Sequence, residues 1–307
     1  MRYYQGGPEL QLLCLDPACL DPEKLKMENG FPHYYDSLPP SAVRWTRSLP
    51  RLRDLKVVLL SQISPSLDCL TGLAERGADL VVLPELPFQP WYPAQRKSSE
   101  LVVSEPCSRQ AELAAQAGLA VLGGGLSGGQ NVACLWDSKG QRQLSYAKMH
   151  RPQEPGFWEC DYFEPGQYPP KVCDALGFPL GVQLCSDIQR PFGASFLQAQ
   201  GCGAILLPRA TEVGTYEHWK LVIRATARMH ATYVATVNRP QPEGGVPLGG
   251  PSLLVDPHGR VVAEGTEDEL WCDLKVSQVV EARAGYPGYL ESPLQVYADS
   301  WGKLAGG

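Results

Sequence analysis

Three residues that could do acyl chemistry together each stand where an apolar segment of the chain ends. Cys185 closes one apolar run, Glu85 follows a second, and Lys148 comes just after Leu144-Ser-Tyr. In layered α/β proteins the ends of neighbouring strands gather at one edge of a sheet, and binding sites form there. These residues are far apart in sequence, yet such a fold would bring them together.

Their side chains are chemically complementary. A thiol can attack a carbonyl carbon, and a glutamate beside it can take the thiol proton and later give it to a leaving amine. Burial would raise the pKa of the glutamate and improve this exchange. A lysine cation favours the thiolate and can hold an oxyanion, with the backbone N–H of Ser186 as a second donor. The set predicts acyl transfer through a thioester.

Each residue alone carries little weight. A Pro-Glu pair is usually a turn, a buried cysteine usually packs, and a lysine is usually solvated. The chain has ten cysteines but no Cys-x-x-Cys pair, and most lie in apolar contexts, so we expect free thiols rather than disulfides. The cluster around His150 (Glu154, Glu159 and Cys160) lacks the spacing of a metal site. We therefore expect neither a metal nor an organic cofactor.

Composition restricts the class of protein. The 307 residues are 44% hydrophobic and 20% charged, which is a normal globular balance. A net charge of −6 without any basic run argues against nucleic-acid or anionic-membrane surfaces. No apolar stretch is long enough to span a bilayer, and the N-terminus lacks a signal-peptide core. We expect a cytoplasmic protein.

Hydrophobic patterning predicts strands and helices that first alternate and then give way to hairpins. The predicted strands are 55–60, 78–84, 119–123, 131–136, 180–185, 204–208, 233–238, 252–256, 261–264 and 271–275. The predicted helices are 68–77, 104–117, 193–200 and 219–230. This order favours one α/β layered domain over residues 54–307 with a mixed sheet or two sheets. Residues 1–53 are interpreted as an extension without chemistry, packed on the domain or on a partner subunit.

The segment Gly123-Gly-Gly-Leu-Ser-Gly128 matches the glycine pattern of dinucleotide-binding turns. A predicted strand follows it, although phosphate binding needs a helix N-terminus at that point. We therefore interpret it as a mobile loop near the site.

Six segments, in order and spacing, resemble the carbon–nitrogen hydrolase family, also called the nitrilase superfamily. They are 77–85, 146–150, 181–187, 203–208, 224–238 and 250–259, so the resemblance covers about residues 54–290. It implies a four-layer α-β-β-α sandwich that pairs through a helical face into a homodimer or larger homo-oligomer. It also implies that Glu85 is the general base and acid, that Lys148 stabilises the oxyanion, and that Cys185 is the nucleophile.

The family often carries a second glutamate between the lysine and the cysteine. We choose Glu159 over Glu154 and Glu164, because the segment from Glu159 to Gly166 resembles the carbamoylase pattern Glu-x-x-Tyr-Phe-Glu-Pro-Gly. The resemblance suggests that this carboxylate positions Lys148 or holds the substrate nitrogen.

Departures from the family pattern concern the substrate. Ser186 and Asp187 follow the nucleophile, where nitrile-hydrolysing members usually have tryptophan and glutamate, so an amide or carbamoyl substrate is favoured. Carbamoylases place paired arginines where this chain has Ile188-Gln189, and only Arg190 follows.

Two further kinds of residue are candidates for substrate contact. Arg209 is an alternative partner for a substrate carboxylate. The aromatic residues nearest the catalytic segments could line a pocket or belong to the core: Phe88, Trp91, Tyr92 and Trp158.

The sequence thus predicts a cysteine-dependent amidohydrolase acting on a small linear amide. Three alternatives stay open: carbamoyl hydrolysis, acyl transfer to a nucleophile other than water, and a catalytically silent binding module.

Overall fold

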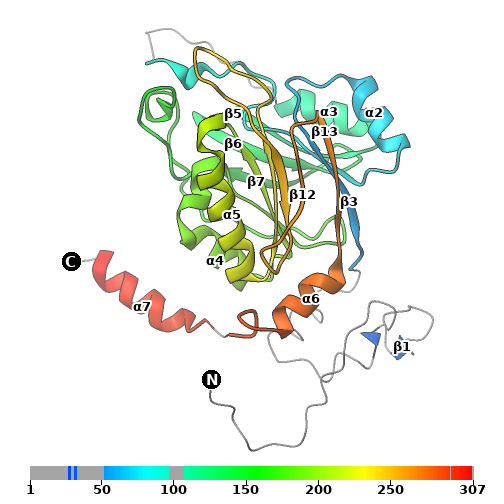
Figure 1. Ribbon diagram of the computed structural model, residues 1–307, viewed down its shortest axis with the longest axis vertical. Coiled ribbons are helices and arrows are strands. Elements are labelled where there is room, and N and C mark those ends of the chain that lie inside the picture. Colours follow the sequence, from blue (N-terminus) through cyan, green and yellow to red (C-terminus); the bar gives the residue numbers. More distant parts are fainter. Residues whose placement is uncertain (1–26, 29–30, 33–51, 97–106, 291, 306–307) are drawn as a thin grey trace, which may run out of the picture.

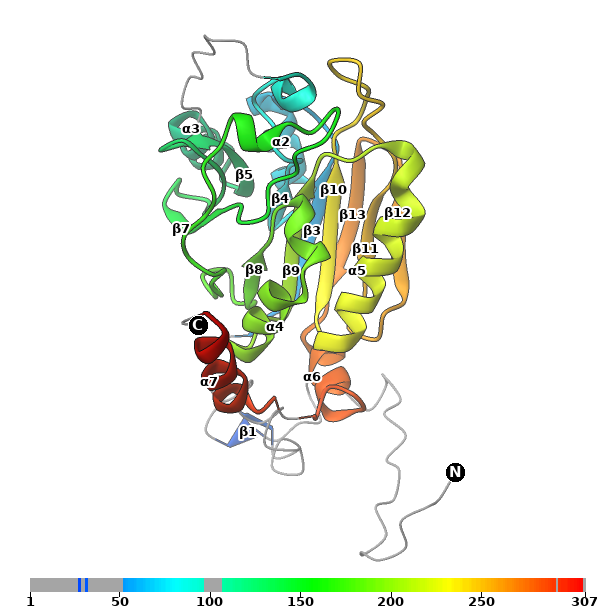
Figure 2. The same cartoon turned by 90° about the vertical axis from the view of Figure 1, so that its left-hand side faces the viewer.

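In the computed structural model, which describes residues 27–28, 31–32, 52–96, 107–290 and 292–305, the domain has four layers (Figures 1 and 2). Two sheets pack face to face in the middle, and a pair of helices covers the outer face of each sheet. The predicted α-β-β-α sandwich is confirmed. Of the 1–53 extension, most residues lie outside the described part; Met27–Glu28 (β1) and Phe31–Pro32 (β2) pair antiparallel.

The first sheet has six strands in the order β13-β3-β4-β5-β6-β7. In chain order they are Leu55–Leu60 (β3), Leu80–Val82 (β4), Ala120–Ser127 (β5), Gln130–Trp136 (β6), Arg142–Ala147 (β7) and Glu269–Leu274 (β13). Strands β3, β4 and β5 run parallel; β13 pairs antiparallel with β3, β6 pairs antiparallel with β5, and β7 pairs antiparallel with β6. The parallel centre delivers Glu85 just beyond β4, and Lys148 follows the edge strand β7.

The second sheet has five strands in the order β12-β11-β10-β9-β8. They are Leu180–Val182 (β8), Ala204–Arg209 (β9), Tyr233–Asn238 (β10), Ser252–Val255 (β11) and Val261–Gly265 (β12). Strands β8, β9 and β10 are parallel, so their carboxyl ends lie at one edge. Cys185 lies at that edge, as the sequence predicts, although the strand predicted over 180–185 ends at Val182 and Cys185 stands beyond it.

Side chains alternate between the two faces of each central strand and so form three buried cores, one between the sheets and one under each pair of helices. Even-numbered residues of β9, such as Ala204 and Leu206, face the other sheet, while Ile205 and Leu207 face the outer helices. Because strands buried on both faces need apolar residues at every position, these segments read as continuous hydrophobic runs. A fourth, smaller cluster lies among the loops beside the candidate residues Glu85 and Cys185: Leu86, Trp91, Phe163, Ala210, Val246 and Leu248.

The helices lie outside the sheets. Leu67–Glu75 (α2) and Cys107–Ala117 (α3) cover the six-stranded sheet, and Pro191–Ala199 (α4) and Tyr216–His230 (α5) cover the other one. Helix α2 begins at Ser66, whose hydroxyl accepts a hydrogen bond from the Cys69 N–H, as an N-cap does. Among the described residues, no helix is long and apolar enough to cross a membrane.

Two features differ from the sequence predictions. The glycine-rich segment 123–127 is not a loop but the second half of β5. Glycine is needed at position 124 because a side chain there would collide with the Val132 carbonyl of the neighbouring strand. Glycine here permits close approach of backbones. Helices Val276–Ala284 (α6) and Leu294–Ala305 (α7) were not predicted, and α7 extends away from the sandwich (Figure 1).

Candidate active site

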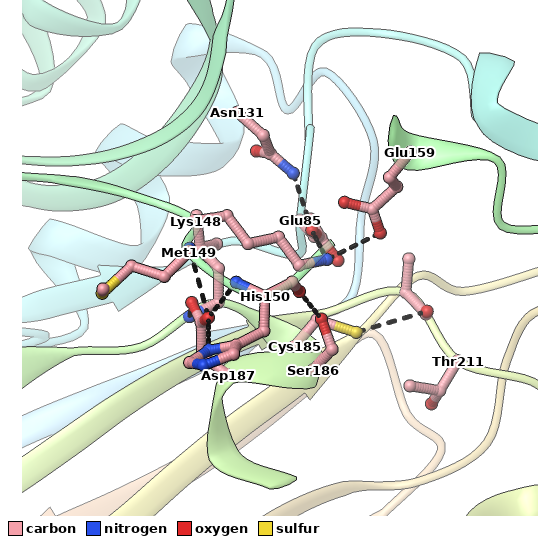
Figure 3. Close-up of polar contacts among 12 residues, drawn as sticks. Glu85, Asn131, Lys148, Met149, His150, Glu159, Cys185, Ser186, Asp187 and Thr211 are labelled. Atoms are coloured by element: carbon pink, nitrogen blue, oxygen red, sulfur yellow. Dashed lines mark hydrogen bonds and ion pairs between the residues drawn. The ribbon is translucent and has the colours of Figure 1, made fainter. Parts of the chain in front are cut away.

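Lys148 joins two glutamates at the centre of the site (Figure 3). Its ammonium nitrogen Nζ lies 2.8 Å from Glu85 Oε1 and 2.6 Å from Glu159 Oε1. All three residues are buried, and Asn131 Nδ2 donates a further hydrogen bond of 2.8 Å to Glu85 Oε1. The structure therefore brings Glu159 to Lys148, as the choice among the three glutamates predicts.

Burial and charge act against each other in this group. Burial alone would lower the pKa of Lys148, but the carboxylates of Glu159 and Glu85 hold that pKa well above its ordinary value. Burial raises the pKa of Glu159 to about 7, although Lys148 opposes the shift. Lys148 is thus a permanent cation, whereas Glu159 takes up a proton near neutral pH.

Cys185 lies beside these charges on a strained turn. It opens the short 3₁₀ helix Cys185–Gln189 (η5) with φ of +45°, a left-handed conformation that costs a non-glycine residue energy. Its thiol donates to the carbonyl of Ala210 at 3.6 Å. Burial, followed by the negative charge of Glu85, raises the pKa of the Cys185 thiol. A raised pKa favours the neutral thiol over the thiolate.

Asp187 holds the turn to the lysine segment, and sequence reasoning assigned it no such role. Its Oδ1 accepts hydrogen bonds from the backbone N–H of Met149 (3.2 Å) and of His150 (2.8 Å), and it lies 2.8 Å from the His150 ring. Its Oδ2 accepts from the Tyr146 hydroxyl at 2.8 Å. One buried carboxylate therefore connects the strand end that carries Lys148 with the turn that carries Cys185.

Ser186 adds a second connection of the same kind, because its hydroxyl donates to the His150 carbonyl. Both links tie residues 149–150 to the three residues 185–187 (Figure 3). Direct hydrogen bonds therefore set the position of the turn that carries Cys185 relative to the segment that carries Lys148.

Arg209, a candidate carboxylate partner, is buried at the end of β9 on the helix side of the sheet. Its Nε donates to Thr236 Oγ1 at 3.0 Å, its Nη1 to Thr211 Oγ1 at 2.7 Å, and its Nη2 to the Pro251 carbonyl. Burial lowers its pKa to about 10. Among the described residues no carboxylate forms an ion pair with it, and its contacts are neutral oxygens and the ring of Tyr216.

The other candidates for substrate contact occupy different surroundings. Trp91 packs in the loop cluster beside the site, and its indole Nε1 donates to Gly156 O at 2.9 Å. The guanidinium of Arg96 lies over the indole ring of Trp158, with 4.0 Å between the guanidinium carbon and the ring centre. Phe88 packs toward the core between the six-stranded sheet and its helices, and Arg190 is exposed where α4 begins. The structure therefore places Trp91 near the catalytic group and Arg190 at the surface.

Comparison with known proteins identifies the family. The model of the carbon–nitrogen hydrolase family matches residues 59–284. The chain belongs to this family. Within it, the chain is 26% identical to an omega-amidase of Xenopus tropicalis over 232 residues, which is 70% of this chain and 83% of the relative. It is 27% identical to a 2-oxoglutaramate amidase of Paenarthrobacter nicotinovorans over 256 residues, 76% and 84% of the two chains.

A solved structure confirms the fold of this carbon–nitrogen hydrolase. An amidase of Nesterenkonia sp. AN1, crystallised with the acetamide moiety of fluoroacetamide on its active-site cysteine, superposes with a TM-score of 0.63 at 23% identity. The superposition covers 80% of this chain and 96% of the other. The predicted amide hydrolase agrees with these relatives, which do not favour carbamoyl hydrolysis, acyl transfer or a silent binding role.

Proposed function

We propose that this protein is a cysteine-dependent amidase that hydrolyses linear primary amides, with Cys185 as the nucleophile. The observation that carries the proposal is the position of Lys148. This buried cation holds one oxygen of each of two glutamates, beside a protonated thiol on a strained turn. Such a group supplies a base, an oxyanion donor and a nucleophile within one water-poor site.

The reaction follows from these positions. Glu85 takes the proton of the Cys185 thiol while the sulfur attacks the amide carbon. Lys148 and the backbone N–H of Ser186 stabilise the oxyanion. The tetrahedral intermediate collapses as Glu85 gives its proton to the nitrogen, so that ammonia leaves and a thioester remains. Glu85 then takes a proton from water, the hydroxide attacks the thioester, and the carboxylic acid is released with the thiol restored.

Two unpaired carboxylate oxygens support a primary amide as substrate. Lys148 uses Oε1 of each glutamate, and Glu85 Oε2 and Glu159 Oε2 are buried with no hydrogen-bond partner in the described part of the chain. A buried acceptor without a donor is costly, so an N–H group of the substrate fits there. A primary amide has two N–H donors, an N,N-dialkyl amide has none, and a nitrile has none.

The names of the relatives point to the rest of the substrate. One relative is named for 2-oxoglutaramate, a monoamide of a dicarboxylic acid whose far end is a carboxylate. Arg209 is the candidate cation for that carboxylate, because no described carboxylate neutralises it. Arg190, exposed at the start of α4, is the second candidate.

Self-association through the outer helices belongs to the same proposal. On α7, large apolar residues recur at the spacing of one helix face and are 51–74% exposed: Leu294, Tyr297, Trp301 and Leu304. Trp301 contacts the exposed ring of Phe192 on α4, with 5.2 Å between ring centres. Such a stripe on a water-exposed helix needs a cover, and we propose a second copy of this chain.

The mass of the protein in solution tests this part. Light scattering should give a multiple of 33.6 kDa, and Trp301→Gln with Leu294→Gln should shift the mass toward the monomer. Lys303→Ala lies off the stripe and should leave the mass unchanged. A monomeric parent protein would contradict the proposal. The expected cytoplasmic location and the absence of nucleic-acid and membrane partners stay predictions.

Ammonia release tests the activity itself. The parent protein should release ammonia from 2-oxoglutaramate and from butyramide, but not from N,N-dimethylbutyramide or butyronitrile. Cys185→Ala should abolish release from both amides. Equal turnover of the primary and the dimethylated amide would overturn the substrate class, and full turnover by Cys185→Ala would overturn the mechanism.

A further inference from the structure

Arg239 donates more hydrogen bonds to the segment that carries Glu85 than to any other part of the described chain. It stands directly after β10 and is fully buried. Its Nη1 donates to the carbonyls of Glu85 and Leu86, both at 2.8 Å, and its Nη2 donates to the Gln89 carbonyl at 2.8 Å. A single guanidinium thus holds three carbonyl groups of one short turn.

The remaining N–H groups bind a carboxylate. Arg239 Nε lies 2.8 Å from Glu243 Oε1, and Nη2 lies 2.7 Å from Glu243 Oε2. A guanidinium has five N–H donors, and these five contacts use all of them. The pairing with Glu243 is the two-point geometry that a lysine cannot reproduce.

The turn that Arg239 holds is strained. Leu86, the residue after the general base, has φ of +53°, in the left-handed region that a leucine rarely occupies. Strain of this kind persists only where surrounding contacts enforce it. The carbonyls on either side of the strained Leu86 φ, those of Glu85 and Leu86, are the two that Nη1 contacts.

The contact also crosses between the sheets. Glu85 follows β4 of the six-stranded sheet, whereas Arg239 follows β10 of the five-stranded sheet that carries Cys185. Glu243 extends the link, because its Oε2 accepts the backbone N–H of Trp91 at 2.9 Å. The backbone of the general base is therefore fixed relative to the sheet of the nucleophile.

We propose that Arg239, supported by Glu243, is the positioning residue of the general base Glu85 in this reaction. Arg239 touches no carboxylate oxygen of Glu85 and acts through the backbone alone. The inference rests on the proposed function, in which Glu85 moves the proton of Cys185. Losing the guanidinium fork of Arg239, which holds the carbonyls of this turn and the Glu243 carboxylate, lets the Glu85 turn relax. Displacement of a base by about 1 Å can reduce turnover about 100-fold.

The first experiment compares Arg239→Lys with the parent enzyme, using 2-oxoglutaramate and ammonia release. We expect kcat to fall about 100-fold with a smaller rise in KM, because the relaxed turn misplaces the base, whereas Glu85 supplies only one of the contacts that bind the substrate. Arg283→Lys is the matched control. Arg283 is also a buried arginine that donates to a carbonyl, that of Cys202, at the opposite end of β9, and its loss should lower stability but not kcat.

The second experiment separates positioning from a general structural role. Arg239→Lys is combined with Glu85→Gln, which removes the base. If Arg239 acts through Glu85, the double variant should be no slower than Glu85→Gln alone, since a turn without a base has nothing to position. The inference would be overturned if Arg239→Lys lowered kcat by the same factor in the parent enzyme and in Glu85→Gln. A kcat equal to that of the parent in Arg239→Lys alone would overturn it as well.

Glu243→Gln keeps the test decisive if Arg239→Lys fails to fold. It weakens one side of the fork while the three carbonyl contacts of Arg239 remain, so we expect a smaller loss of kcat that again disappears in the Glu85→Gln background. A loss that persists there would contradict the inference. Full activity of Glu85→Gln itself would instead contradict the proposed function, which keeps the two failures distinguishable.

Discussion

The two sheets bring different chemistry to the same edge of the molecule. The six-stranded sheet and the loop after it supply charge: Glu85, Lys148 and Glu159 form a buried ionic group. The five-stranded sheet supplies a neutral thiol on a strained turn, with a carbonyl as its hydrogen-bond acceptor. In the proposed reaction neither half suffices alone, because the first lacks a nucleophile and the second lacks a base.

The difference explains why contacts between the sheets matter for catalysis. Asp187 and Ser186 bind the backbone of residues 149–150, and Arg239 binds the backbone of residues 85–89. Each contact joins an element of one sheet to an element of the other. Substitutions in the charged group, at the thiol, and in the contacts at the boundary between the two sheets should therefore have distinct effects on kcat and stability.

Removing the neutral thiol that the five-stranded sheet supplies should have the largest effect on kcat. Cys185→Ala should lower kcat for 2-oxoglutaramate by about 10⁴-fold or more, because no acyl-enzyme can form. Folding should be intact, since the change removes one sulfur atom from a buried position. Ammonia release and thermal unfolding measured on the same preparation check both statements. Retained turnover would mean that the nucleophile lies elsewhere.

Removing the cation from the charged half should lower both activity and stability. Lys148→Met removes the only ion-pair partner described for two buried carboxylates, of which Glu85 keeps the Asn131 amide, and breaking such a buried pair destabilises a protein by about 3–5 kcal/mol. Loss of an oxyanion donor should reduce kcat by about 10²–10³-fold. Urea unfolding and ammonia release measure the two effects. A variant as stable as the parent would show that the ionic group is not buried as described.

Weakening the boundary itself should have an intermediate effect. Asp187→Asn removes the charge that accepts the N–H groups of Met149 and His150, and hydrogen bonds to a charged group contribute about 1.5–3 kcal/mol each. We expect lower kcat with little change in KM, because Lys148 and Cys185 lose their common support. Glu217→Gln, on the exposed side of α5, is the control with unchanged kinetics. A pure rise in KM would point to substrate binding instead.

The smallest effect should be the pH dependence contributed by Glu159. Its pKa is about 7 in the folded protein, above its ordinary value of 4.5. The folded state therefore holds more protons than the unfolded state between these values, so stability falls as pH rises from about 4.5 to about 7. Glu159→Gln cannot titrate and should reduce this slope in urea unfolding at several pH values. An unchanged slope would mean that Glu159 is ionised throughout.

The sequence predicted the parts of the fold that depend on local patterning. The strand at Leu55–Leu60 was predicted at its observed bounds, since a continuous apolar run next to turn residues has few other interpretations. Helix α7 was missed because its apolar stripe is mostly exposed rather than part of the core, with Trp301 against the exposed ring of Phe192 on α4. The glycines of β5 looked like a loop because their reason, close packing against β6, lies in another strand.

The catalytic candidates were predictable for a different reason. Glu85, Lys148 and Cys185 each sit beside a strand end, so their convergence follows from the layering of the fold. Arg239 was not predictable, because its contacts with residues 85–89 join positions about 150 apart and involve backbone carbonyls that have no sequence signature. The role of Asp187 was missed for the same reason, although its segment was recognised.

The most direct test of the account is the mass of the protein during turnover. The parent enzyme is mixed with 2-oxoglutaramate, quenched in acid, and measured intact and after digestion. The account predicts one added acyl group per chain, equal to the substrate minus ammonia, on the peptide that contains Cys185, and none on Cys185→Ala. An acyl group on any other residue, or turnover by Cys185→Ala, would contradict it.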